Sequence, residues 1–417
     1  MKTTKFFFMA ALSLAFAACS NDDNEFQAPA QAGGIPFSAT ISIDNADSRA
    51  LAEGGSGLVA TWEVGEKVAV IQTKSGTCDE MEVKSVSGGL ATITGTVSGT
   101  PSNGDPVRVI YPATAADATT GDVKTDLLYT QTGGTLSDVA SKYDVRKNDT
   151  KLKVEAGVAS LDGNVKLTQL YSIFKFTLST LYGVSIPAST FTVSDGTHVY
   201  AITTSSPLSD IFIVLPELAP GTYWFTAEKK RELWSSINYV NKATISSATS
   251  VGQYYPSEIK MATTGDEIKL DGKFYQSGTS DAVAVIAYVG GMTDAPGYTH
   301  GLAIALDELG KMAWTDAVTA CEAKTDPIDA HWMLPTLNQW KNMFQVNDSE
   351  DSSPGALRSL VSTSGGTHMS EAYYWTSTDD GDSYYAWYVD LTYSGRVYYH
   401  STGDKPAEMI ARACLAF

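Results

Sequence analysis

The stretch from His331 to Trp340, HWMLPTLNQW, places the strongest constraint on how this chain can fold. Pro335 has no backbone N–H and biases Leu334 toward extended geometry, so a strand or loop is expected to end there. Thr336 and Gln339 form a capping-box pattern, which marks the start of a helix. The apolar residues that follow recur at helical spacing: Leu337, Trp340, Met343 and Phe344. An extended segment followed by an amphipathic helix is therefore predicted from residue 331 onward.

The segments on either side predict a second helix and several strands. Upstream, residues 314–324 (WTDAVTACEAK) carry apolar side chains at helical spacing. Downstream, a strand is predicted in which one set of alternating residues shares a face: Tyr385, Trp387, Val389 and Leu391. Ser394-Gly395 is a turn signal, and residues 396–400 are expected to return as the second arm of a hairpin. Residues 409–417 are one further strand candidate.

This order of elements resembles the bacterial C-type-lectin-like domain, and the resemblance covers residues 275–417. The positions that match the family's core motifs are Trp314, Trp332, Leu334, Pro335, Trp340, Trp375, Trp387 and Arg412. In that family a cysteine of the first helix is commonly bridged to one of the last strand, so the resemblance implies a Cys321–Cys414 disulfide. Two buried free thiols are the alternative, because cysteine is often a plain core residue.

The N-terminus predicts export and a lipid anchor. Lys2 and Lys5 precede an apolar run that is short for a membrane span and ends in small residues before Cys19, so residues 1–18 are a lipoprotein signal peptide. Phe16 to Cys19 resembles a lipobox, with Phe16 in the place of the usual aliphatic residue. Cys19 would carry the lipid, and several acyl chains give stable anchoring. The acidic run after Cys19 resembles a surface-export signal of Bacteroidetes, and residues 19–35 are expected to be a linker.

Composition indicates a mainly β protein of several domains. The 417 residues include 35 glycines and 21 tyrosines, only 18% are charged, and helical periodicity is seldom sustained. A net charge of −18 argues against nucleic acid as a partner. Short alternating runs between turn residues predict one β-sandwich over residues 36–156 and a second over 157–260, with a linker over 261–274.

The first of these sandwiches resembles the fimbrillin-like proteins of Bacteroidetes, which have two stacked transthyretin-like sandwiches. The resemblance lies in the run PFSATI, in Ser48-Arg49-Ala50, and in Trp62 followed by Gly65-Glu66. It implies that a protease cuts between Arg49 and Ala50 and releases the first strand, so that a neighbouring subunit can add a strand in its place. An ordinary loop arginine is the alternative at this position.

Residues with catalytic potential are sparse, and an enzyme is not expected. The five histidines are scattered and the sequence has no Gly-x-Ser-x-Gly elbow, phosphate-binding loop or paired-cysteine metal site. No histidine lies near Cys78 in sequence to activate it, so a buried or loop thiol is expected there. No metal is expected, although Asp379, Asp380 and Asp382 are candidate calcium ligands, with a solvated turn as the alternative.

The candidate ligand-binding residues are these three aspartates together with Tyr384, Tyr398 and His400. Aromatic rings can stack on sugar faces or anchor a protein partner.

Together these features predict a lipid-anchored fimbrial adhesin on the cell surface, at the tip of its fibre. Its expected partners are other pilin subunits, which it would meet by strand addition, and a glycan or protein ligand. A non-polymerising glycan-binding lipoprotein of a nutrient-uptake system is the first alternative. An enzyme built on the lectin-like fold is the second, and it would need a pocket of converging polar groups.

Overall fold

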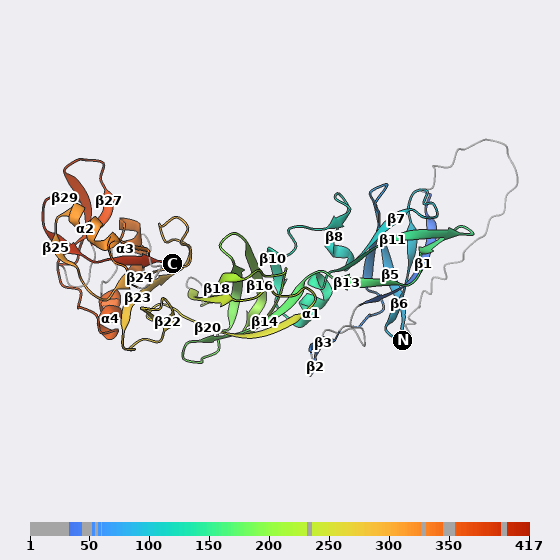
Figure 1. The fold of residues 1–417 in the computed structure, drawn as a ribbon, viewed down its shortest axis with the longest axis horizontal. Helices are drawn as coiled ribbons and strands as arrows, with labels where there is room; N and C mark the ends of the chain where they lie inside the picture. The colour runs from blue at the N-terminus through green and yellow to red at the C-terminus, as the bar shows by residue number, and fades with distance from the viewer. Residues whose placement is uncertain are drawn as a thin grey trace, which may run out of the picture.

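The computed structural model describes residues 33–43, 61–231, 236–326, 331–344, 355–392 and 398–417, and the backbone alone of two short strands, β2 (Ala52–Gly54) and β3 (Gly57–Val59). Strands dominate this part of the chain, so the fold is mainly β, as predicted. Three bodies follow one another in a row from the N-terminal to the C-terminal end of an elongated molecule (Figure 1). None of the helices in the described part is long and apolar enough to cross a membrane.

The first body is an eight-stranded sheet in the order β12-β1-β13-β11-β7-β4-β5-β6. Its strands are β1 (Ile35–Ile43), β4 (Lys67–Gln72), β5 (Thr77–Ser87), β6 (Leu90–Val97), β7 (Pro106–Tyr111), β11 (Arg146–Glu155), β12 (Val158–Leu161) and β13 (Val165–Gln169). Because β1 also pairs with β6, the sheet closes on itself around an apolar core. A 3₁₀ turn and a small two-stranded ribbon lie on its side: η1 (Ala113–Ala115), β8 (Ala116–Asp117) and β9 (Asp122–Val123).

The second body is a sandwich of a five-stranded sheet, β10-β16-β15-β18-β19, and a three-stranded sheet, β17-β14-β20. Its elements are β10 (Thr130–Gly133), α1 (Leu136–Asp138), η2 (Val139–Tyr143), β14 (Ser172–Thr180), β15 (Ala188–Ser194), β16 (Val199–Leu208), β17 (Asp210–Leu215), β18 (Gly221–Lys230), β19 (Ser236–Ile245) and β20 (Tyr254–Met261). The two sheets face each other through aromatic rings, with Phe176 of β14 at 5.2 Å from Phe191 and 5.6 Å from Phe225.

The strands of the first two bodies are not divided at a single point in the sequence. Strands β12 and β13 lie beyond residue 156, where the first sandwich was predicted to end, yet they pair with β1 and β11. Strand β10 lies before that boundary and pairs with β16 of the second body. Non-local pairing, which short alternating runs do not encode, decides which sheet each strand joins.

The third body, called here the C-terminal domain, combines two sheets with three helices in its described residues. Its elements are β21 (Glu267–Lys269), β22 (Phe274–Tyr275), β23 (Ala282–Val289), β24 (Gly301–Ala305), β25 (Gly310–Met312), α2 (Trp314–Glu322), β26 (His331–Met333), α3 (Leu337–Met343), α4 (Gly355–Thr363), β27 (Tyr373–Asp379), β28 (Tyr385–Asp390), β29 (Tyr398–Asp404), β30 (Met409–Ala411) and β31 (Cys414–Ala416). The sheets have the orders β22-β21-β23-β24-β31-β26 and β25-β30-β27-β28-β29.

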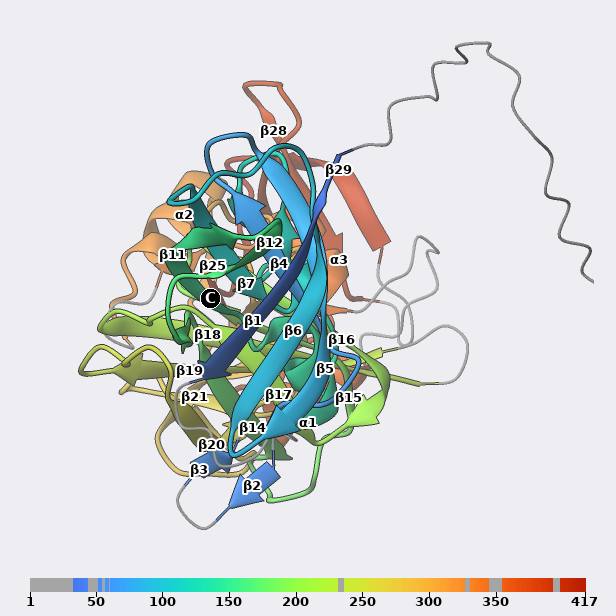
Figure 2. The same ribbon diagram turned by 90° about the vertical axis from the view of Figure 1, so that its right-hand side faces the viewer.

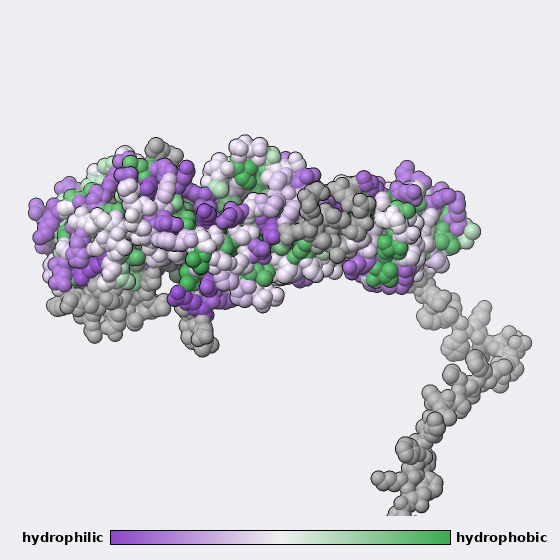
Figure 3. Space-filling model, turned by 90° about the horizontal axis from the view of Figure 1, so that it is seen from below, coloured by the Kyte–Doolittle hydropathy of each residue, from purple (hydrophilic) through white to green (hydrophobic). Residues whose placement is uncertain are grey.

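Local sequence signals account for several of these elements. The predicted capping box is present, because the Thr336 hydroxyl accepts from the Gln339 N–H while the Gln339 carboxamide accepts from the Thr336 N–H. The predicted hairpin is also present as β28 and β29. On the face of the molecule shown in Figure 3, apolar residues form small separate patches among polar ones.

Candidate functional site

Strand β1 is an integral part of the first sheet rather than a flap on its surface. It pairs antiparallel with β6 over seven residues, from Ile35↔Val97 to Ile41↔Ala91, and parallel with β12 and β13 on its other side. Figure 2 shows β1 lying alongside β6 at the N-terminal end of the molecule. The side chains of β1 alternate between core and surface as predicted, and the buried ones are Phe37, Ala39, Ile41 and Ile43. Removing β1 would therefore open a groove with an apolar floor.

The Trp62, Gly65 and Glu66 motif forms the turn that begins β4. Gly65 has φ of +95°, which an L side chain rarely adopts. The Glu66 carboxylate accepts hydrogen bonds from the Glu63 N–H at 2.9 Å and the Tyr111 hydroxyl at 2.8 Å. The Trp62 ring packs edge-on against the same Tyr111, with centroids 5.1 Å apart. The motif thus holds the chain against the core where it enters β4.

Two sequence-based predictions lie outside the described residues. They are the lipidation of Cys19 and the protease cut between Arg49 and Ala50. Cys19 precedes residue 33, where the description begins, and Arg49 and Ala50 lie between Ile43 of β1 and residue 61, where the full description resumes. Both remain predictions.

The tryptophans of the C-terminal domain tie its helices to its strands. Trp332, Trp340 and Trp375 are buried, as are Leu334 and Pro335, whereas Trp314 and Trp387 are half-buried. Four indole N–H groups donate to backbone carbonyls: Trp314 to Thr376 at 2.7 Å, Trp340 to Trp375 at 3.3 Å, Trp375 to Met312 at 2.9 Å, and Trp332 to Asp326. These tryptophans therefore stabilise the fold of the domain.

Arg412 divides the predicted terminal strand into two. It is fully buried between β30 and β31, which belong to different sheets. Its guanidinium donates to the carbonyls of Ala305 at 3.0 Å and Thr367 at 2.6 Å, and it pairs with Glu308 at 3.2 Å. Residues 409–417 therefore form two short strands rather than the single strand that their hydrophobicity indicated.

The disulfide implied by the lectin-like resemblance is not formed in the structure. Cys321 and Cys414 are both buried free thiols. The two cysteines belong to different apolar clusters: Cys321 lies in one with Leu415, and Cys414 lies in another with Trp340, although the thiols are close enough for Cys321 to contribute to the raised pKa of Cys414. The Cys414 thiol donates instead to the Gln339 carboxamide at 3.4 Å. Cys78 is also a free thiol, at the edge of a small apolar cluster.

The acidic loop at residues 379–382 is built from turns. The carboxylates of Asp379, Asp380 and Asp382 accept from the N–H groups two residues ahead of each, at 3.1, 2.9 and 2.8 Å. The Lys405 ammonium lies 2.8 Å from Asp379 and lowers the pKa of that carboxyl. Each carboxylate therefore stabilises the turn that it begins. The Lys405 ammonium already lies beside Asp379, where a calcium ion would have to bind. In the described part of the chain no three His, Cys, Asp or Glu side chains converge on a metal site.

Of the candidate aromatic residues, Tyr384 directly follows this loop, whereas Tyr398 and His400 lie on β29. Tyr384 is 70% exposed and points away from the core. Tyr398 and His400 lie in β29, where their backbones pair with Asp390 and Tyr388, and their side chains lie outside the described residues. Of the candidate ligand-binding residues, the structure thus brings the three aspartates and Tyr384 together on one loop.

A cleft that the sequence reasoning missed lies between the second sandwich and the C-terminal domain. Its volume is about 630 Å³, and both bodies contribute to its walls. The floor is the outer face of the five-stranded sheet, whose hydroxyl residues alternate along β15 as Thr190, Thr192 and Ser194. That alternation is visible in the sequence, but it is equally typical of a solvent-facing strand.

Comparisons with known proteins give distant likenesses only. No family model matches the chain, and no curated protein matches it. A fimbrial protein from Bacteroides ovatus is similar at 15% identity over 92% of this chain and 99% of its own, with a TM-score of 0.33. A fimbrial assembly protein from Parabacteroides distasonis matches at 13% identity over 54% of this chain and 90% of its own, with a TM-score of 0.29. The C-terminal fragment of a pilus adhesin from Lactobacillus rhamnosus matches at 7% identity over 55% and 98%, with a TM-score of 0.16. With TM-scores this low, none of these likenesses carries weight for fold or function.

Proposed function

We propose that the chain is a lipid-anchored fimbrial adhesin that accepts a strand from a neighbouring subunit at the position of β1 and presents a lectin-like C-terminal domain at the fibre tip. The observation that carries the proposal is the position of β1 between β6 and the β12 and β13 strands. The polar segment that follows it, residues 44–50, contains Arg49. A cut there would leave β1 attached only by its sheet contacts.

The energetics favour replacement of β1 over its simple loss. Burying Phe37, Ile41 and Ile43 contributes roughly 5–9 kcal/mol in all, at about 1.5–3 kcal/mol for each side chain. Strand β1 also supplies backbone hydrogen bonds on both of its edges. A donor strand with apolar residues at alternate positions would restore both contributions, because the side-chain period of a strand is two.

The tip position is supported by the strands near the end of the second and third bodies, which are built into their own sheets. Strand β20 pairs in parallel with β14 over eight residues. Strand β31 lies between β24 and β26, and the Phe417 carbonyl accepts from the N–H groups of His300 and Gly301. Neither strand is free to be donated. This subunit would therefore accept a strand from a neighbour but would donate neither β20 nor β31.

The surface location rests on the predicted lipid at Cys19 and the acidic run that follows it. In this proposal the lipid holds the subunit at the outer membrane until assembly. The lectin-like character of the C-terminal domain is supported by its order of elements: α2, then β26 and α3 at the Trp-x-Leu-Pro sequence, then the β27–β28–β29 strands. The ligand class on this basis is a glycan or a protein.

The test is proteolysis followed by strand rescue. The chain from residue 20 is digested with an arginine-specific protease, and N-terminal sequencing locates the cuts. We expect one early cut between Arg49 and Ala50, with Arg49→Gln as the uncut control. A peptide with the β1 sequence, IPFSATISI, and one copied from a pilin's C-terminal strand should then raise the melting temperature of the cut protein.

A peptide of the same composition, with its apolar residues moved by one position, is the matched control. It should fail to rescue, because a one-residue slip turns every side chain to the other face. No cut at Arg49, or a cut protein that no peptide stabilises, would contradict the proposal and leave a stand-alone surface binding protein.

A further inference from the structure

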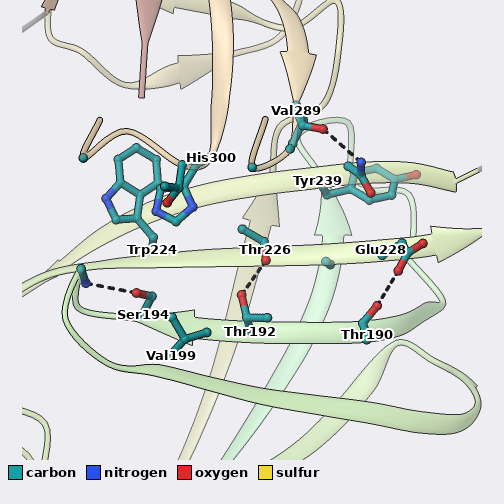
Figure 4. A pocket seen from close by; sticks show the side chains of 17 residues that line it. Thr190, Thr192, Ser194, Val199, Trp224, Thr226, Glu228, Tyr239, Val289 and His300 are labelled. Atoms are coloured by element: carbon teal, nitrogen blue, oxygen red, sulfur yellow. Dashed lines mark hydrogen bonds between the residues drawn. The ribbon is translucent and has the colours of Figure 1, made fainter. Parts of the chain in front are cut away.

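The cleft between the second sandwich and the C-terminal domain has a floor of cross-strand polar pairs. On β15 and β18, Thr192 lies opposite Thr226, and Thr190 lies opposite Glu228. Figure 4 shows these two pairs side by side, with Trp224 and His300 stacked at one end of the row. The stacked rings have centroids 4.4 Å apart. The cleft therefore offers hydroxyl and carboxylate oxygens in a line, closed at one end by aromatic rings.

Both polar pairs keep hydrogen-bonding capacity for a ligand. One hydrogen bond of 2.5 Å joins the Thr192 and Thr226 hydroxyls. Only one of the two hydroxyls donates in this bond, so the O–H of the other can donate to a ligand. The Glu228 carboxylate accepts from Thr190 at 2.8 Å and from Ser236, and two of its lone-pair directions remain. The Ser236 hydrogen bond lowers the pKa of Glu228, so the carboxylate is ionised at neutral pH. All four groups are only half-buried and accessible from the cleft.

The C-terminal domain supplies the opposite wall and fixes the width of the cleft. Its contribution comes from Val289 to Gly291 and from Gly297 to His300. Asn238 of β19 donates to the Val289 carbonyl at 3.0 Å, which joins the two bodies at the edge of the cleft. Burial lowers the pKa of His300 to about 4, so the ring stacked on Trp224 is neutral at physiological pH.

The charge and shape of the lining select the class of ligand. Glu228 is the one charged side chain among the described residues that line the cleft, and two cations act on the lining from outside it: Lys230, which contributes to the lowered pKa of Glu228, and Lys242, 5.6 Å over the Trp224 ring. The carboxylate inside the cleft and the cations around it together favour a neutral ligand over phosphate or another anion. Apolar surface from Val199, Val289 and Tyr239 lies among the hydroxyls. A volume of about 630 Å³ is within the range of small-molecule sites. Sugars match this mixture, because they carry hydroxyls that donate and accept around an apolar ring face.

We propose that this cleft is a binding site for a short neutral oligosaccharide, held by the Thr192–Thr226 and Thr190–Glu228 pairs between the two bodies. The site differs from the acidic loop of residues 379–382. Because its lining residues belong to the second and third bodies, it is independent of the proposed exchange of β1. The two proposals can therefore fail separately.

The test uses the chain from residue 20, uncut by protease, titrated by calorimetry with defined probes. Neutral probes are maltotriose, xylotriose, cellotriose, mannotriose and N-acetyllactosamine, and the charged probes are sialyllactose and hexalysine. We expect at least one neutral sugar to bind and the charged probes to bind at least tenfold more weakly. Thr226→Val and Glu228→Gln should each weaken sugar binding roughly tenfold, the effect of losing one good hydrogen bond.

Thr222→Val is the matched control. Thr222 lies on the same face of β18 as Thr226, and its hydroxyl lies 3.3 Å from that of Thr244 on the neighbouring strand. Unlike Thr226, it does not line the cleft. It should leave affinity unchanged, and the melting temperatures of all variants should match the parent. The proposal is overturned if no neutral sugar binds, if a charged probe binds best, or if Thr222→Val weakens binding as much as Thr226→Val. It is equally overturned if Tyr384→Ser abolishes binding that Thr226→Val leaves intact.

Discussion

Replacing Asp266 by asparagine should stabilise the C-terminal domain at neutral pH and lose most of that effect in acid. Asp266 is 3% exposed and lies immediately before β21, where its carboxylate accepts from the Thr263 N–H at 2.8 Å. Burial raises the pKa of this carboxyl to about 6 from 3.8, with the neighbouring Glu267 adding to the shift. The charged form is thus disfavoured in the folded protein relative to the unfolded chain.

The sign and size of the effect follow from this pKa. A carboxyl whose folded pKa lies above its unfolded pKa binds more protons in the folded state, so its contribution to stability is lost as the pH rises from about 4 to 6. The difference between a pKa of 3.8 and one of about 6, at about 1.4 kcal/mol for each pH unit, corresponds to about 3 kcal/mol at pH 7.5. Asparagine imitates the protonated carboxyl and still accepts from Thr263. Asp266→Asn should therefore gain up to about 3 kcal/mol at pH 7.5 and only about 1 kcal/mol at pH 4.5.

The assay is urea unfolding at several pH values, followed by tryptophan fluorescence, since five of the eight tryptophans lie in the C-terminal domain. Asp271→Asn is the control: Asp271 accepts from Lys273 and Tyr275, and these hydrogen bonds lower its pKa, so its replacement should not stabilise the domain at neutral pH. A difference between Asp266→Asn and the parent that does not change with pH, or a loss of stability at pH 7.5, would refute the reasoning.

Three further outcomes are expected. Gly301→Ala should cost about 1–3 kcal/mol in unfolding free energy, because the new methyl carbon would lie 2.5 Å from the Tyr288 carbonyl oxygen and from the Phe417 ring, whereas Gly221→Ala, with nothing within 4 Å, should be neutral in the same thermal melt. Arg412→Met should cost roughly 3–5 kcal/mol in urea unfolding, because Glu308 loses its cationic partner and keeps only the hydrogen bond from the Tyr374 hydroxyl, and the exposed Lys311→Met should stay close to the parent; equal effects would contradict the role given to Arg412. In the unreduced chain from residue 20, a thiol reagent should count three thiols, Cys78, Cys321 and Cys414, after unfolding, and before unfolding Cys321 and Cys414 should react far more slowly, because burial raises the pKa of Cys321 to about 12 and that of Cys414 as well; a count of one would restore the disulfide.

Short sequence patterns correctly predicted the elements that depend on interactions between residues close together in the sequence. The Thr336–Gln339 capping box begins α3, and the alternation of Phe37, Ala39, Ile41 and Ile43 gives β1 its buried face. In both cases the signal and the interaction it predicts lie within a few residues of one another. The period of a strand is regular over β1 but broken in β28 by an irregularity between Ala386 and Tyr388, so the predicted faces of that strand are only partly separated.

The pairing of distant segments decided what those patterns left open. Leu415 and Cys414 of β31 belong to different apolar clusters, with Cys321 in the cluster of Leu415, so the position of each thiol follows from the tertiary packing and not from the spacing of the cysteines in the sequence. Arg412 is buried because Ala305, Thr367 and Glu308 come together from three separate parts of the C-terminal domain.

The sequence by itself determined a mainly β chain, the helix that begins at Thr336 and the apolar face of β1, since each follows from residue spacing and backbone chemistry. The tertiary structure alone decided which sheet β10, β12 and β13 join, and it alone formed the cleft between β15, β18 and the Val289–His300 wall. The physical reason is that a strand's pattern encodes which side is apolar but not which partner covers it. A site shared by two bodies exists only after both have folded and met.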